Sequence, residues 1–314
     1  MNFTEFRARY ERREIIPYPN NVKEKPLLSV LVQTYNHENF IQKCLEGILE
    51  QRTDFDFEIL LGEDNSTDKT RDICIEYAEK YPKKIRLFLH HPENKIKVLN
   101  IITGNFNALY NFYSARGEYI AFCEGDDVWK DPLKLQKQVD VLKQNTHLAF
   151  TYHSFIEVNH KEELLPKEFV LEQPAQNISR EDLKKLNFHP LLSTMCFRNF
   201  GNELPEQMAE VINVDSFLLS LLGNFGEAEF IENIAPSYYK RHEGGMWSGR
   251  NKELKLKSKN LTFEALQKYY HYKGEEELNK EFRKEIKNTH RILFLYYLKK
   301  FQFLNSFYLM RSLF

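Results

Sequence analysis

The chain has 314 residues, and its 44 Lys and Arg against 45 Asp and Glu give a formal net charge of −1. This length allows one large α/β domain, or a domain of about 200–250 residues with a smaller appendage. The balanced charge argues against a nucleic-acid partner, and 42% hydrophobic with 28% charged residues excludes a disordered chain.

Four cysteines lie far apart in the sequence, and none belongs to a CxxC pair. Their spacing therefore fits neither a zinc site nor a disulfide framework. We expect buried, reduced thiols and, with them, a cytoplasmic protein. Residues 1–21 lack the apolar core of a signal peptide, and the longest apolar run, 292–298, is far shorter than the roughly 18 residues of a membrane span.

From residue 27, short apolar runs alternate with amphipathic stretches. The runs predict buried strands, and apolar residues at helical spacing predict helices between them. Ser66, Thr67 and Asp68 offer caps for the second helix, and Pro132 marks the start of the fourth. The expected strands are 27–32, 57–62, 85–89, 118–123 and 147–152, and the expected helices are 40–49, 73–81, about 104–115 and 132–142.

Strands that alternate with helices are typical of βαβ units, and so of a mainly parallel sheet with helices on both faces. The polar residues 155–180 predict a long irregular excursion, after which short strands and one helix, 214–222, resume the domain. Lysine-rich helix formers beyond residue 250 predict a C-terminal helical extension. The expected division is an N-terminal extension at 1–25, an α/β domain at 26–250 and a helical tail at 251–314.

Parallel sheets bind ligands beyond the carboxyl ends of their strands, so the loops at 33–39, 62–68 and 123–131 are expected to converge on one site. None of the 12 glycines lies in a GxGxxG or GxxxxGK[ST] arrangement, and GxSxG and HExxH motifs are missing from the sequence. Dehydrogenase, P-loop, esterase and zincin functions therefore have no support.

Three carboxylates, Glu124, Asp126 and Asp127, directly follow the fourth predicted strand. Carboxylates packed so closely repel one another unless a cation or solvent offsets their charge. Their oxygens suit Mg²⁺ or Mn²⁺, which can also bind the oxygens of a substrate phosphate. The alternative is a solvated acidic turn that precedes the helix at Pro132.

The two other loops carry groups that suit a nucleoside. Asp64 follows the second strand, where a carboxylate can accept hydrogen bonds from a base or from ribose hydroxyls. Tyr35 follows the first strand, and its ring offers a stacking surface for a base. The alternative for Tyr35 is a surface aromatic residue at a helix entry.

These segments, SVLVQTYNHENF, EILLGEDNSTDKT and GEYIAFCEGDDVWKDPLKLQKQV, resemble the inverting nucleotide-sugar glycosyltransferases of family 2, which have the Rossmann-like GT-A fold. The resemblance covers residues 27–153 in register and continues loosely to about residue 250. It implies that residues 26–153 bind the nucleotide sugar and that 154–250 form the acceptor side. It further implies nucleotide-binding roles for Tyr35, Asp64, Gly125 and Asp126, and a D-x-D metal element made of Glu124, Gly125 and Asp126 with Asp127 beside it.

The resemblance also implies an acidic catalytic base before a hydrophobic helix. Asp215 in NVDSFLL matches this position, although an aspartate there could instead cap the helix. Arg241, His242 and Trp247 belong to a segment, YKRHEGGMWS, that would close over the diphosphate and the acceptor. The alternative for that segment is a glycine-rich turn with a packed tryptophan.

Two further positions have weaker matches to the family. His189 begins a segment that would face the acceptor. The position after the third strand where the family often has a basic residue could be that of Lys95, Lys97 or Asn105.

The implied activity is metal-dependent transfer of a sugar, with inversion, from a nucleoside diphosphate, expected to be UDP, to a hydroxyl of a glycan or lipid-linked acceptor in bacterial surface-polysaccharide assembly. Mn²⁺ or Mg²⁺ would be the cofactor. A nucleotidyltransferase acting on sugar phosphates and a non-catalytic nucleotide-sugar-binding relative are the alternatives. Residues 287–314 hold five Lys and Arg and no acidic residue among many apolar ones, which suits either the inner face of the cell membrane or a protein surface such as a second subunit.

Overall fold

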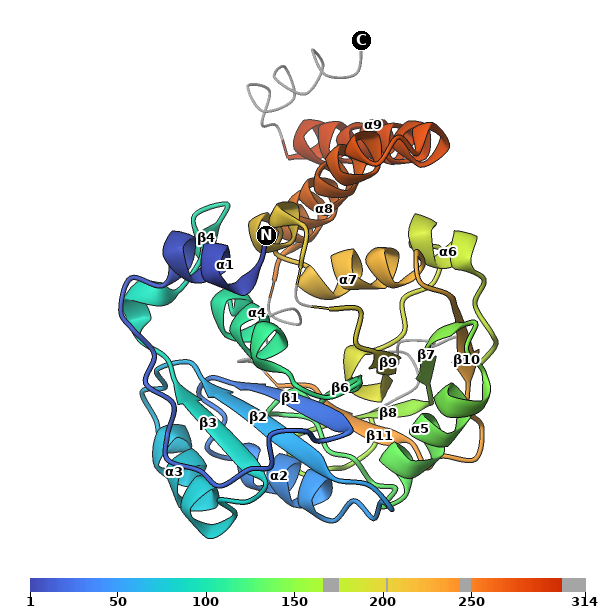
Figure 1. Ribbon diagram of the computed structural model, residues 1–314. Helices are drawn as coiled ribbons and strands as arrows, with labels where there is room; N and C mark the ends of the chain where they lie inside the picture. Colours follow the sequence, from blue (N-terminus) through green and yellow to red (C-terminus); the bar gives the residue numbers. More distant parts are fainter. Residues whose placement is uncertain (166–174, 202, 243–249, 301–314) are drawn as a thin grey trace.

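A computed structural model describes residues 1–165, 175–201, 203–242 and 250–300 of the protein (Figure 1). Its centre is a seven-stranded sheet in the order β10-β7-β9-β6-β1-β2-β3. Neighbouring strands run parallel except β9, which is antiparallel to both β6 and β7. The strands are β1 Leu28–Thr34, β2 Phe57–Glu63, β3 Ile85–Leu89, β6 Tyr119–Phe122, β7 Leu148–Tyr152, β9 Cys196–Arg198 and β10 Glu227–Phe230. The predicted mainly parallel α/β sheet is confirmed.

Helices cover both faces of this sheet (Figure 1). One face carries α4 and α7, and the other carries α2, α3 and α5. Their bounds are α2 Ile41–Leu49, α3 Thr70–Lys80, α4 Asn105–Ser114, α5 Lys134–Gln144 and α7 Val214–Leu222. Both faces of the central strands are therefore dry, as β1 illustrates: Leu31 belongs to the core under α4, whereas Val30 and Val32 belong to the core under α2 and α5. This is why the strand is an unbroken apolar run.

The start of α3 differs from its predicted capping. Lys69 occupies the N-cap position and makes no side-chain cap bond. Ser66 instead accepts a hydrogen bond from the backbone N–H of Asn36 (3.0 Å), so it joins two loops rather than capping a helix. Asp68 does serve the helix, since its carboxylate accepts from the backbone N–H of Thr70 (2.9 Å).

Several small elements add to the predicted pattern. Helix α1, Phe3–Tyr10, packs its Phe6 ring on Phe106 of α4, with ring centres 5.4 Å apart. β4 Lys97–Val98 and β5 Ile101–Ile102 form a short hairpin. β8 Phe155–Val158 pairs in parallel with β11 Ser237–Lys240, so part of the expected excursion is a strand. All four cysteines are buried free thiols, as predicted.

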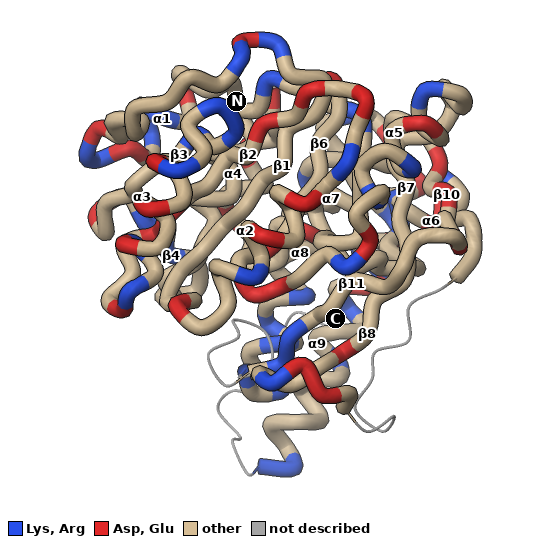
Figure 2. Tube along the Cα trace, turned by 90° about the horizontal axis from the view of Figure 1, so that it is seen from below, with Lys and Arg blue, Asp and Glu red and all other residues tan. Residues whose placement is uncertain are grey.

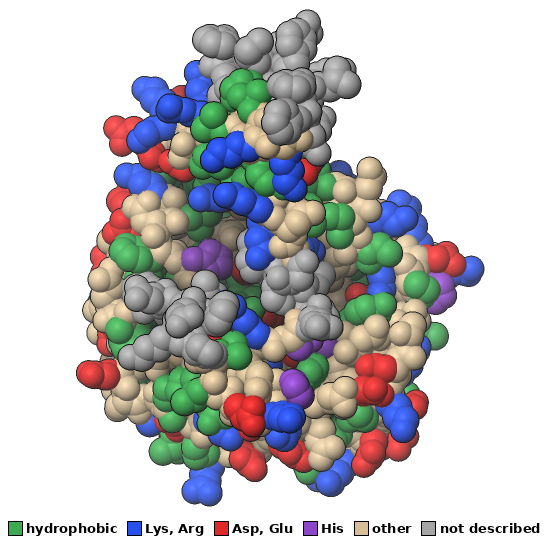
Figure 3. Space-filling model, turned by 180° about the vertical axis from the view of Figure 1, so that it is seen from behind, with side chains coloured by type: hydrophobic (Ala, Val, Ile, Leu, Met, Phe, Trp, Pro, Cys, Tyr) green, Lys and Arg blue, Asp and Glu red, His purple; other side chains and the backbone are tan. Residues whose placement is uncertain are grey.

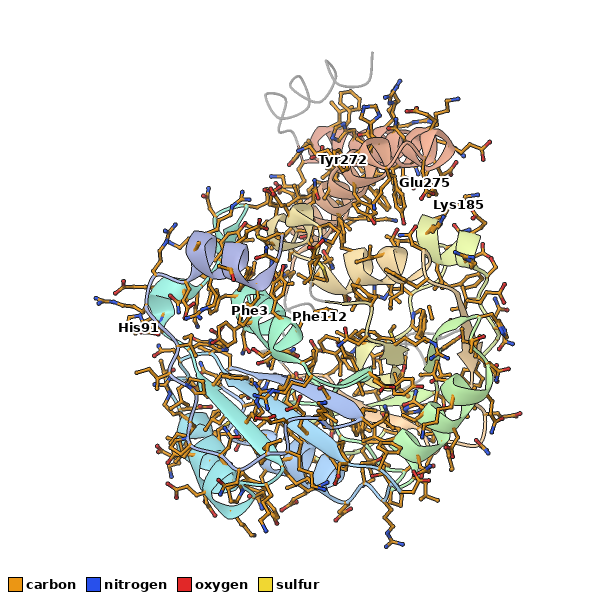
Figure 4. All side chains as sticks on the ribbon, viewed as in Figure 1. Phe3, His91, Phe112, Lys185, Tyr272 and Glu275 are labelled. Carbon is orange, nitrogen blue, oxygen red and sulfur yellow. The ribbon has the colours of Figure 1, made fainter. Side chains whose placement is uncertain are left out.

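The predicted C-terminal helical extension is confirmed as two long helices, α8 Lys252–Tyr272 and α9 Glu276–Lys299. They pack on each other through Phe263, Tyr270 and Phe282. Their turn reaches α6, Arg180–Lys185, where Lys184 Nζ lies 3.0 Å from Glu275 Oε2. Figure 4 labels Tyr272 and Glu275 at this turn, with Lys185 of α6 below them.

Positive and negative residues are mixed over the sheet domain, without a large region of one sign (Figure 2). Figure 2 shows Lys and Arg interspersed with Asp and Glu over the loops and helices. Across the described residues, every helix is too short or too polar to cross a membrane.

Candidate functional site

The loops after β1, β2 and β6 meet at one edge of the sheet, as predicted. β1 lies between β2 and β6, so the carboxyl ends of the three strands are neighbours. The side chain of Asn36 accepts a hydrogen bond from the backbone N–H of Thr67 (2.8 Å), and Gly125 N–H donates to the carbonyl of Gln33 (2.9 Å). Asn36 has a left-handed backbone with φ 54°, which asparagine tolerates better than most residues. These hydrogen bonds hold the three loops next to one another.

Tyr35, Asp64 and Lys95 form one group at this edge. Lys95 Nζ lies 3.5 Å from Asp64 Oδ2 and 3.8 Å from the ring centre of Tyr35. Asp64 is 5% exposed, whereas Tyr35 is 44% exposed. Within the described residues, Asp64 Oδ1 has no hydrogen-bond partner. The group therefore presents an accessible aromatic ring beside a carboxylate oxygen that can accept a bond from a ligand.

The charge state of Asp64 reflects this burial. Loss of solvent raises the pKa of Asp64 to about 7, even though the charge and hydrogen bond of Lys95 act to lower it. A carboxyl whose pKa lies close to neutrality in a site is a frequent sign of function.

Of the three candidates for the basic position after the third strand, Lys95 is the one that lies at this site. Lys97 is exposed on β4. Asn105 is buried at the start of α4, where its side chain donates to the carbonyl of Val211 (2.6 Å).

His37, Asp126 and His242 form a second group next to the first. Their ligand atoms lie within 4.8 Å of one another, and among the described residues they make up the group that could hold a metal ion. His242 Nε2 lies 3.0 Å from Asp126 Oδ2, and His37 Nε2 lies 3.9 Å from the same oxygen. The pKa of Asp126 is below its ordinary value. Both imidazoles stabilise the carboxylate, and their effect outweighs burial, which acts to raise the pKa. Burial lowers the pKa of His37, which favours the neutral ring.

Gly125 is required by close packing beneath this group. A Cβ atom at this position would lie 2.8 Å from His37 Nδ1 and 2.8 Å from Thr34 Oγ1. Only glycine lets the 124–127 turn approach the β1 loop so closely. The turn residue predicted to bind nucleotide thus also sets the position of His37.

The other two carboxylates of the acidic turn occupy different surroundings. Asp127 is fully buried, and neither of its carboxylate oxygens has a hydrogen-bond partner in the described parts of the chain. Burial and the charges of Asp126 and Glu124 raise its pKa well above the ordinary value. Glu124 is partly exposed, and burial together with the Asp126 and Asp215 charges raises its pKa to about 8. The metal roles of Glu124 and Asp127 stay predictions.

Asp215 lies in the first turn of α7. Its charge is one of the causes of the raised pKa of Glu124. Asn213, not Asp215, occupies the N-cap position of α7, so the capping alternative for Asp215 is wrong. His189 Nε2 lies 3.5 Å from Asp215 Oδ2 and 2.9 Å from Ser216 Oγ. The side chains of His189 and Asp215 are 43% and 38% exposed, so solvent and a ligand can reach both.

The segment after β11 is divided between several roles. Arg241 Nε lies 2.6 Å from Glu157 Oε2, and that carboxylate is completely buried. His242 joins the Asp126 group, with its ring centre 4.6 Å from that of Phe40. Trp247 lies outside the described residues. A hollow with Lys, Arg and His side chains at its edges is visible below the C-terminal helices in the view from behind (Figure 3).

Two residues of the site have no role assigned from the sequence. His37 stands inside the quoted segment SVLVQTYNHENF, so its position at a strand end was a usable signal. Glu157 gave no signal, because its burial depends on the pairing of β8 with β11.

The chain matches the model of glycosyl transferase family 2 over residues 29–201, which is more than half of its length. An uncharacterized protein of Mycobacterium tuberculosis is 32% identical over 222 residues, which are 70% of this chain and 60% of that protein. An uncharacterized glycosyltransferase of Nostoc sp. is 33% identical over 126 residues, 40% of this chain and 36% of that one. The chain thus spans about three fifths or less of these relatives.

One solved structure has the same fold. The mannosyltransferase PcManGT of Pyrobaculum calidifontis, in complex with GDP-Man and Mn²⁺, superposes with a TM-score of 0.51 at 18% identity, over 82% of this chain and 68% of that one. At this identity the likeness concerns the fold alone.

Proposed function

Because this chain belongs to glycosyl transferase family 2 and has the GT-A fold, we propose that it transfers a sugar from a nucleoside diphosphate, UDP by expectation, to a hydroxyl of a glycan or lipid-linked acceptor. The observation that carries this proposal is the adjacency of two groups at one sheet edge. Tyr35, Asp64 and Lys95 suit a nucleoside, and the Asp126 group suits a diphosphate with a divalent cation.

The nucleoside would lie on the exposed ring of Tyr35. Asp64 would accept hydrogen bonds from the base or the ribose through Oδ1, which is buried and has no partner among the described residues. Lys95 would favour the ionised form of Asp64 against the effect of burial and bring a positive charge toward the diphosphate. Gly125 and Asp126 would line the adjoining part of the nucleotide site, as the resemblance implies.

Asp126 and His242 fit a divalent cation, Mn²⁺ or Mg²⁺, since a carboxylate and an imidazole are both ligands of such ions. When bound, the cation supplies positive charge that stabilises the departing diphosphate. Glu124 and Asp127 remain proposed further members of this metal element. Arg241 and Trp247 remain proposed contacts of the diphosphate and the acceptor, with Arg241 also held by Glu157.

Asp215 would be the catalytic base of an inverting displacement. It would take the proton from the acceptor hydroxyl while that oxygen attacks the anomeric carbon on the face opposite the diphosphate. His189 and Ser216, which lie beside it, would fix the direction of its carboxylate.

Membership of family 2 argues against the nucleotidyltransferase alternative. A non-catalytic nucleotide-sugar-binding relative is still to be separated from an enzyme by experiment. We further propose that the protein acts in the cytoplasm on surface-polysaccharide precursors. Its α9 helix would rest on the inner face of the membrane.

The substitution Asp215→Asn tests the proposed enzyme role. It should abolish sugar transfer and leave the affinity for the nucleotide sugar within about twofold, since Asp215 would meet only the acceptor. Asp54→Asn, the same change at an exposed aspartate between α2 and β2, is the matched control. Normal turnover in Asp215→Asn would show that the base assignment is wrong.

A further inference from the structure

We propose that His37 is a third ligand of the cation beside Asp126 and His242, so that two imidazoles take part and the site favours a divalent transition metal such as Mn²⁺ over Mg²⁺. This inference rests on the proposed function, because it concerns the cation of the same site. His37 comes from the loop that carries Tyr35, whereas Asp126 and His242 come from two other parts of the chain.

The distances within the group suit a shared ion. Six-coordinate ions of this size have bonds of about 2.1 Å, so their ligand atoms lie about 3.0 Å apart when adjacent and about 4.2 Å apart when opposite. The separations of 3.0 Å from His242 Nε2 and 3.9 Å from His37 Nε2 to Asp126 Oδ2 fall in this range. The value of 3.9 Å is also too long for a direct hydrogen bond, so a hydrogen bond to Asp126 does not explain the position of His37.

His37 is held in this position by the protein itself. Its backbone N–H donates to Thr70 Oγ1 (2.7 Å), and its ring meets Phe40 edge to face at 6.2 Å. The close approach of Gly125 bounds the Nδ1 side of the ring. The side chain is only 16% exposed. An imidazole fixed in this way loses little freedom when it binds an ion, which favours tight binding.

The donor atoms determine the choice of metal. Mg²⁺ prefers oxygen ligands and keeps several waters, whereas imidazole nitrogen suits transition metals. An imidazole ligand carries no negative charge, whereas each carboxylate ligand offsets one positive charge of the cation. Imidazole ligands therefore leave the cation more positive charge with which to attract a diphosphate.

Counting the nitrogen ligands of bound Mn²⁺ tests the proposal directly. We would load the full-length protein with Mn²⁺ alone, titrate the free ion by electron paramagnetic resonance, and count ¹⁴N couplings by pulsed methods. The wild type should show two coupled nitrogens, and His37→Ala should show one, with Mn²⁺ affinity at least about tenfold weaker and less preference over competing Mg²⁺. His147→Ala, at an exposed histidine directly before the amino end of β7, should match the wild type.

The outcomes separate this inference from the proposed function. A single nitrogen in the wild type, or unchanged Mn²⁺ affinity in a folded His37→Ala protein, would overturn the role of His37 while leaving the transferase proposal intact. If the wild type binds no Mn²⁺, with or without UDP, both the inference and the proposed metal dependence are wrong. The nitrogen count on the wild type does not require any variant to fold.

Discussion

The ammonium group of Lys95 lies 3.5 Å from the buried carboxylate of Asp64. Lys95 is itself 9% exposed in its side chain, so two charges are held away from solvent next to the accessible ring of Tyr35. A buried ion pair is costly to assemble and seldom adds stability for its own sake. We infer that the pair instead orients the Asp64 oxygen that receives the nucleoside.

Donor binding should therefore depend on the ionisation of Asp64. Since burial raises the pKa of Asp64 to about 7 in the free protein, the carboxylate that accepts hydrogen bonds is mostly present at pH 8 and about one tenth present at pH 6. The affinity for UDP should fall as the pH is lowered across this range, by up to about tenfold. Isothermal titration calorimetry with UDP in the presence of a chelator measures this affinity in the absence of the cation.

Asp64→Asn supplies the control for that experiment. It should bind UDP more weakly than the wild type at pH 8, and its remaining pH dependence reports the titration of UDP itself. If UDP affinity changed with pH in the same way in Asp64→Asn and in the wild type, Asp64 would not receive the nucleoside as an ionised carboxylate.

The pair Arg241 and Glu157 allows a structural role to be separated from a binding role. Arg241→Gln removes the cation beside a completely buried carboxylate, and because Arg241 itself is 32% exposed, this should lower the free energy of unfolding by about 1–3 kcal/mol. The double variant Arg241→Gln, Glu157→Gln should recover most of this loss in denaturant unfolding.

The UDP affinity of the same double variant then tests whether Arg241 also binds the diphosphate. If Arg241 also contacts the diphosphate, the double variant should remain at least about fivefold weaker than the wild type in UDP affinity. A stable double variant with wild-type affinity would limit Arg241 to holding β11 against β8.

Helix α9 has an exposed apolar row in its second half. Ile292, Leu295 and Leu298 are 40%, 49% and 37% exposed, and residues 287–300 contain Lys and Arg but no acidic residue. Replacing the three by serine should reduce flotation of the protein with anionic vesicles severalfold, because the apolar face inserts at the headgroup level. Serine substitutions at Ile16, Ile102 and Phe225, which are exposed apolar residues outside α9, are the matched control.

The same triple variant distinguishes the membrane from a protein partner. Unchanged flotation would contradict the membrane proposal. If the variant instead turned a wild-type dimer into a monomer by light scattering, α9 would contact a second copy of the chain.

The fold was more predictable from the sequence than the site. The buried strands are unbroken apolar runs, so β1 and β2 were located to within two residues. Because the strands before them were expected to be parallel, the loops that carry Tyr35, Asp64 and Asp126 were predicted to lie at the same edge of the sheet. Helix α1 was missed because much of its surface is polar and its Phe6 is buried only against α4. The antiparallel insertion of β9 could not be foreseen, because three residues carry no information about their neighbours in a sheet.

Side-chain partners were the least predictable part. Asp126 was recognised by its position after a strand, yet His242 comes from 116 positions further along the chain. The resemblance placed His242 near the diphosphate, but a linear pattern does not show that its ring meets Asp126. Likewise, Arg241 looked available for a diphosphate until β8 placed Glu157 against it.

The most direct test of metal-assisted sugar transfer is a hydrolysis assay. The protein is incubated with Mn²⁺ and a panel of UDP- and GDP-linked sugars, water serves as the acceptor, and the released nucleoside diphosphate is measured. The wild type should cleave at least one of these donors in a manner abolished by chelator, and Asp126→Asn should lower the rate at least about a hundredfold while keeping its fold. Failure of the wild type to cleave any donor that it binds, or equal rates in Asp126→Asn, would contradict a metal-assisted sugar transferase and favour a binding role.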